Sequence, residues 1–152
     1  REEQHCESSL CTGHLLVWTW RKMVAGEAGC PLLIHEYETL AGPRAEEMLS
    51  AISTFLVLLG RASRRVLTVG SPLCAGVTRD EGQILCLICA AQDGDAALVT
   101  AHLSWLVHTG SAQTVRGALA NLSELLADCG ARLPRLQQGA PPPGRPALEI
   151  IR

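Results

Sequence analysis

The stretch Met48–Gly60, MLSAISTFLVLLG, is the most apolar part of the chain, and it decides the fold. Its large apolar side chains recur at the spacing of one helix face, at Met48, Ile52, Phe55 and Leu59. Val57 and Leu58 add apolar surface on other faces, so we expect a central helix that follows Gly42-Pro43 and runs to about Ala62. A stretch of 13 residues is too short to span a bilayer and predicts a buried core helix.

Helical periodicity continues on both sides of this stretch. The further helices that it predicts, with approximate ends, are Leu10–Ala25, Pro31–Leu40, Thr78–Gln92, Ala96–His108 and Ser111–Cys129. Thr78-Arg79-Asp80-Glu81 has the pattern of a capping box, in which the Thr hydroxyl and the Glu carboxylate satisfy free backbone amides. The sequence therefore predicts an all-α fold, a single compact bundle of about six helices.

The remaining segments predict one domain with two appendages. Residues 1–9 are expected to be a flexible N-terminal segment, and residues 10–131 the helical domain, with an irregular loop at 63–77. Residues 132–152 form a Pro-rich tail, because Pro134–Pro146 contains five prolines and predicts an extended linker. Ala147–Ile151 turns apolar again, and this short end could dock on its own domain or on a partner subunit.

Composition predicts a protein that associates with itself. Of the 152 residues, 47% are hydrophobic and only 18% are charged, against about 25% in an average protein. A small domain this apolar has difficulty hiding its surface as a monomer, so we expect a homodimer. Large aromatic or apolar side chains are favoured at interfaces, and the candidates are Trp18, Trp20, Trp105, Ile150 and Ile151.

Charge and cysteine usage predict the compartment. The start is polar and charged, with no apolar segment of the kind found in secretory signals, and no stretch is suited to cross a membrane. The seven cysteines form an odd set and predict free thiols in a reducing cytoplasm. The leading hypothesis is a cytoplasmic helical module for protein interaction or regulation that acts as a homodimer.

A second hypothesis is DNA binding. The stretch Leu106–Arg116, LVHTGSAQTVR, resembles the turn of helix-turn-helix proteins, which reads Gly-x-Ser-x-x-Thr-Val, although here no residue separates the Gly from the Ser. The resemblance implies that the second helix of the pair is a recognition helix. Its first residues would face the major groove: Ser111, Gln113, Thr114 and Arg116. The sequence pI of about 6.2 speaks against nucleic acid as the partner.

A third hypothesis is a sensor based on a metal or a thiol. Thiolates and imidazoles are zinc ligands, and such residues gather near the start at His5, Cys6, Cys11 and His14, although their spacing is not that of a zinc finger. Cys74 lies in a Gly/Ser loop and is a candidate reactive thiol. No nucleophile–base pair or paired carboxylates stand out, so no catalytic residue and no cofactor is predicted, zinc remaining the one possibility.

Overall fold

The computed structural model describes residues 2–73 and 76–133, with side chains described from Thr12 onward. The α-helices of this part are α1 (Glu2–Val24), α2 (Pro31–Ala41), α3 (Ala45–Ala62), α4 (Arg79–Gln92), α5 (Ala96–Leu106) and α6 (Ala112–Asp128). Short 3-10 turns at Gly42–Arg44 and Thr109–Ser111 lead into α3 and α6. The described residues contain no strand, only an isolated bridge, so the predicted all-α bundle is confirmed.

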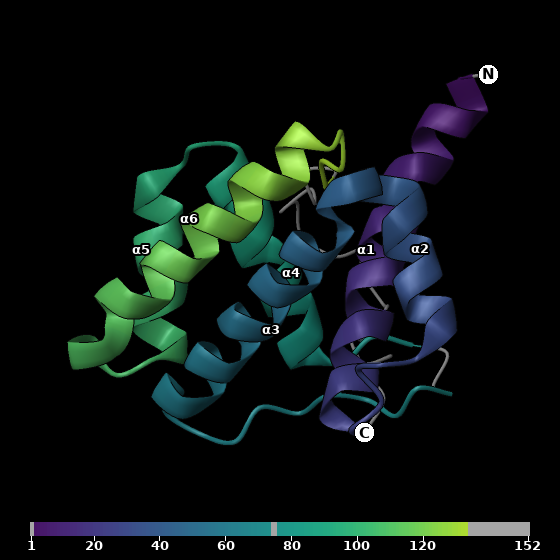
Figure 1. The fold of residues 1–152 in the computed structure, drawn as a ribbon. Helices are drawn as coiled ribbons and strands as arrows, with labels where there is room; N and C mark the ends of the chain where they lie inside the picture. Colours follow the sequence, from purple (N-terminus) through teal and green to yellow (C-terminus); the bar gives the residue numbers. More distant parts are fainter. Residues whose placement is uncertain (1, 74–75, 134–152) are drawn as a thin grey trace, which may run out of the picture.

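Helix α3 lies at the centre of the bundle, as its apolar pattern predicts. It packs against α2 on one side and α6 on the other (Figure 1). Its buried positions include the whole predicted face: Met48, Ile52, Phe55 and Leu59. Helices α1 and α2 are joined by a buried hydrogen bond between the hydroxyls of Thr19 and Tyr37, whose oxygens are 2.7 Å apart.

Two helix ends differ from the predicted ones. Helix α1 begins at Glu2, earlier than the expected start at Leu10, so the expected flexible segment 1–9 overlaps this helix. Helix α5 ends at Leu106, because the chain becomes extended at Val107 and bridges to Ser63. The bridge is made by backbone hydrogen bonds of 2.9 Å on each side of it, and it ties the α5–α6 connection to the end of α3.

Hydrogen bonds to the first turn of α4 fix the irregular segment 63–77 in place. Asp80, buried at the start of α4, accepts two hydrogen bonds from the Arg65 guanidinium, at 3.0 and 2.5 Å. It also accepts a hydrogen bond of 2.6 Å from the backbone amide of Thr68. The segment's described residues, 63–73 and 76–77, contain no helix or strand, as predicted, and side chains of α4 fix their course.

Glu81 is the most heavily bonded carboxylate of the described chain. It completes the predicted capping box: its carboxylate accepts a hydrogen bond of 2.9 Å from the backbone amide of Thr78. In return, the Thr78 hydroxyl accepts a hydrogen bond from the backbone amide of Glu81. The Arg21 guanidinium of α1 donates to its two oxygens at 2.9 and 2.7 Å, and the Gly70 amide donates at 2.9 Å. Glu81 is 0% exposed and Arg21 is 5% exposed, so this ion pair is buried. We call the contacts of Asp80 and Glu81 the α4 clamp.

The α4 clamp lowers the pKa of both carboxyl groups. For Asp80 the largest cause is the hydrogen bond from Arg65, which outweighs burial and is helped by the Thr68 amide. For Glu81 burial alone would raise the pKa, but the hydrogen bonds from Arg21, Thr78 and Gly70 together lower it. Both groups are therefore charged in the folded protein at neutral pH.

Removing Arg21 is expected to destabilise the fold strongly. Arg21→Met leaves the Glu81 carboxylate buried without its cation, and the loss of one partner from a buried pair costs about 3–5 kcal/mol of unfolding free energy. The control is Arg61→Met, at an exposed position of α3, which should change that free energy by no more than about 0.5 kcal/mol. Urea unfolding measures the free energy of unfolding of both variants. Equal losses in the two variants would contradict a stabilising role of the α4 clamp.

The α4 clamp should also weaken in acid. A lowered pKa in the folded state stabilises the fold above the group's ordinary pKa, here 3.8 for Asp80 and 4.5 for Glu81, and this stabilisation is lost as pH falls below these values toward the lowered pKa. Glu81→Gln should therefore be less stable than the unmodified chain at neutral pH, and the difference should shrink on acidification. Thermal unfolding across pH tests this, with the exposed Glu36→Gln as control; a difference independent of pH would refute it.

Candidate functional site

The outer side of α5 carries no charged side chain. Helix α5 lies at the edge of the bundle, with α4 and α6 on its inner side (Figure 1). Its exposed side chains are uncharged and, except for one tryptophan, small: Ala96, Ala97, Thr100, Ala101, Ser104 and Trp105. Ala97, Ala101, Ser104 and Trp105 follow one another at helical spacing and form one stripe, which we call the α5 face.

Trp105 dominates the α5 face because 78% of its surface is exposed. Beside it, the Ser104 hydroxyl donates to the carbonyl of Ala101 at 2.8 Å, so this polar group is already satisfied within the helix. The Arg64 guanidinium donates to the Ser104 carbonyl at 3.1 Å and puts one cation at the carboxyl end of α5, where it offsets the helix dipole. The stripe itself is apolar or internally satisfied.

His102 lies beside this face and adds no charge to it. The residue is half-buried, and its Nε2 atom is buried without a hydrogen-bond partner. Burial lowers the pKa of His102, because the charged imidazolium loses hydration that nothing replaces. His102 is therefore neutral at physiological pH.

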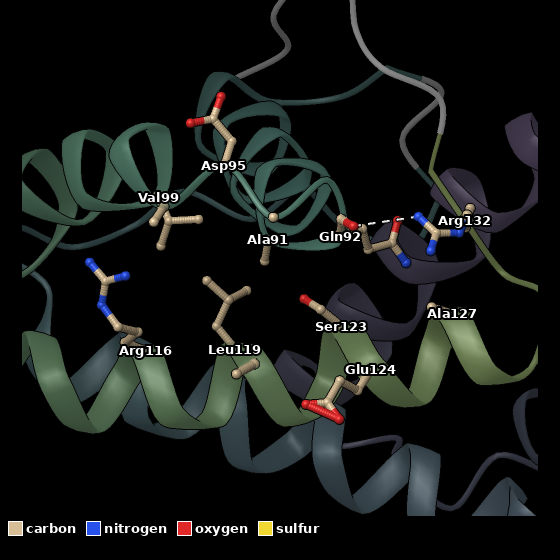
Figure 2. A pocket seen from close by; sticks show the side chains of 13 residues that line it. Ala91, Gln92, Asp95, Val99, Arg116, Leu119, Ser123, Glu124, Ala127 and Arg132 are labelled. Carbon is tan, nitrogen blue, oxygen red and sulfur yellow. Dashed lines mark hydrogen bonds between the residues drawn. The ribbon is translucent and has the colours of Figure 1, made fainter.

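A groove of about 410 Å³ separates α6 from the α4–α5 turn. Figure 2 shows Ala91, Gln92 and Val99 on one side of it and Leu119, Ser123 and Ala127 of α6 on the other. Gly94, whose φ of 72° favours glycine, makes the turn that places α5 beside α4. We call this space the α4–α6 groove.

The α4–α6 groove has an arginine at each end and an unpaired hydroxyl on its floor. Arg116 donates to the Thr100 hydroxyl at 2.5 Å, and Arg132 donates to the Gln92 carbonyl at 3.4 Å. The Ser123 side chain is 4% exposed, and its oxygen has no hydrogen-bond partner. The groove therefore combines an apolar lining with positive charge and unsatisfied bonding capacity.

The structure separates the three tryptophans predicted as interface candidates. Trp20 is 0% exposed and packs in the core, which leaves it no surface for a second molecule in this fold. Trp18 is half-buried under Lys22, whose Nζ lies 5.7 Å from the ring centroid. Trp105 is the exposed one. Ile150 and Ile151 lie outside the described residues.

The residues predicted to face DNA lie around the 3-10 turn before α6. Gln113 and Thr114 are exposed, and Ser111 is half-buried. Arg116 lies at one end of the α4–α6 groove and reaches across to α5, where it donates to the Thr100 hydroxyl. The structure thus places the one cation of this set in the groove.

The predicted metal and thiol residues fall mostly outside what the structure describes. His14 is exposed on α1, whereas the side chains of His5, Cys6 and Cys11, and all of Cys74, lie outside the described residues. Among the described side chains, no three His, Cys, Asp or Glu residues come together as a metal site would require.

Cys30 is a candidate thiol that the sequence analysis did not single out. It occupies the N-cap position of α2, where it is half-exposed. The backbone amide of Leu33 lowers its pKa most, against the opposing effect of burial, and the amide of Leu32 and the charge of Lys22 lower it further. A cysteine directly before Pro31, at a predicted helix start, was the signal that could have found it.

No protein-family model matches the chain, and no curated protein or solved structure is detectably similar to it. Within the described residues, no helix combines the length and the apolar character needed to cross a membrane.

Proposed function

We propose that the chain is a protein-interaction module that forms a two-fold dimer through the α5 face. The observation that carries the proposal is Trp105, a large aromatic side chain that is 78% exposed on a helix without any charged residue. Aromatic residues are enriched in interfaces and charged residues are depleted from their centres. A low charged fraction of 18% in the whole chain supports the same conclusion.

The sequence of the α5 face suits a contact between two copies. In an antiparallel pair of α5 helices centred on Ala101, Trp105 of each copy lies opposite Ala97 of the other, so the largest side chain meets one of the smallest. A two-fold contact requires such self-complementarity. No charge would be buried without a partner within the stripe, and burial of unpaired charge is the most costly fault of an interface.

We assign this module to the cytoplasm. Cys30, Cys86 and Cys129 are free thiols among the described residues, which supports a reducing compartment.

The dimer is tested by Ala101→Arg, which would bring two like charges together on the symmetry axis. We expect the unmodified chain to run as a dimer in light scattering coupled to gel filtration, and the variant to run as a monomer. Trp105→Ser should weaken association by about 30-fold, since a central aromatic contributes about 2 kcal/mol or more. The matched control is Ser53→Arg, at another exposed position, on α3, which should stay dimeric.

Two outcomes of this experiment would contradict the proposal. One is an unmodified chain that stays monomeric over the full accessible range of protein concentration. The other is a dimer that persists in Ala101→Arg, because the contact would then lie elsewhere on the molecule.

A further inference from the structure

We infer that the α4–α6 groove binds the chain's own segment Ala147–Ile151. This segment reads ALEII, three large apolar residues around one carboxylate. The inference is independent of the dimer, because the groove lies between α6 and the α4–α5 turn, whereas the α5 face points outward.

The chain leaves the described domain at one end of this groove. After α6, Gly130 adopts a φ of 78° and turns the chain back toward α4. The Leu133 amide then donates to the Gln92 side chain at 2.8 Å, and Leu133 is buried. Arg132 itself lines the groove. Whatever follows Leu133 therefore starts beside this groove.

The linker is long enough to return a segment along the groove. The part of α6 that lines it runs from Arg116 to Ala127, which is about 16 Å at the helical rise. The linker Pro134–Pro146 reaches about 40 Å when extended and averages about 20 Å between its ends when flexible. A tether that matches its span in this way holds the segment near the groove at an effective concentration on the order of millimolar.

The chemistry of the segment matches that of the groove. The apolar surface for Leu148 and the isoleucines comes from the alanines of the groove that keep exposed surface: Ala91, Ala96, Ala120 and Ala127. Val99 and Leu119 also line the groove but are buried, and Arg116 lies at one end as a partner for Glu149. The acidic side chains that line the groove do not repel Glu149 from this position. Figure 2 shows the Asp95 and Glu124 carboxylates pointing away from the space between α4 and α6, and Asp95 caps α5 by accepting the Leu98 amide at 3.1 Å.

The floor of the groove provides an independent reason for an occupant. The buried Ser123 hydroxyl has no partner, and such a group costs about 1–3 kcal/mol relative to a satisfied one. Rotation of the Ser123 side chain toward the groove would let the backbone of an extended segment supply the missing hydrogen bond. Because the segment is tethered, it would also cover the groove against other peptides with the same pattern of apolar residues around an acid.

The test uses the full chain with isotope-labelled leucine and valine methyl groups. The double substitution Ile150→Asp with Ile151→Asp should displace the NMR signals of Val99 and Leu119. It should leave Leu56 and Leu67 unchanged, since they line a different groove near the end of α3. The matched control is Leu136→Asp, the same kind of change within the linker, which should move none of these signals.

The proposed ion pair between Arg116 and Glu149 is tested by reversing the two charges. Arg116→Glu and Glu149→Arg should each produce the displaced signals of Val99 and Leu119, and the two together should restore the original ones. Unchanged signals of Val99 and Leu119 in the double aspartate variant, or changes confined to Leu56 and Leu67, would overturn the inference.

A mixing experiment distinguishes the chain's own segment from that of a second copy. Labelled double aspartate variant is mixed with an excess of unlabelled, unmodified chain. If the segment docks in its own molecule, the displaced signals stay where they are. Their return to the original positions would show docking from a neighbouring copy and would overturn the inference as stated.

Discussion

The buried carboxylate of Glu81 is the constraint on which the described structure depends. A carboxylate without exposed surface is tolerated only when a cation and hydrogen-bond donors surround it. Here the donors come from three separate parts of the chain: Arg21 of α1, Gly70 of the irregular segment, and Thr78 at the start of α4. These parts must therefore assemble together, and the position of α4 follows from the needs of one side chain.

The placement of α4 determines which surfaces remain for binding. Helix α5 packs on α4, and α6 packs on both α3 and α4, so no other helix of the described residues covers the outer side of α5. The ion pairs of the two buried carboxylates, Asp80 and Glu81, lie beside segment 63–77, whereas α5 contributes no charge. This separation leaves an apolar face around Trp105 and a groove lined by Arg116, the two surfaces to which we assign binding.

The sequence predicted the parts of the fold that depend on patterns among residues close together in the chain. The spacing of Met48, Ile52, Phe55 and Leu59 identified the central helix, and Thr78 with Glu81 identified the start of α4. It could not predict contacts between distant residues. Arg21 and Glu81 are 60 positions apart. The early end of α5 depends on Ser63, which approaches Val107 only after folding.

The same limit applies to the candidate sites. The sequence singled out both Trp18 and Trp20 as interface candidates, but only the packed bundle shows that Trp20 is the buried one. Likewise, Arg116 drew attention as part of a resemblance to a DNA-binding turn, and the groove beside it became visible only once α4 and α6 were placed together. Local patterns identified the residues, and long-range packing determined their surroundings.

The most direct test of the central claim is amide hydrogen exchange measured along the intact chain at low and high protein concentration. If two copies meet through the α5 face, exchange in α5 should slow as the concentration rises, because association protects the face around Trp105. Exchange in α2, which lies outside the proposed contact, should not depend on concentration. Exchange in α5 that is independent of concentration, or protection that appears on another helix instead, would contradict the account.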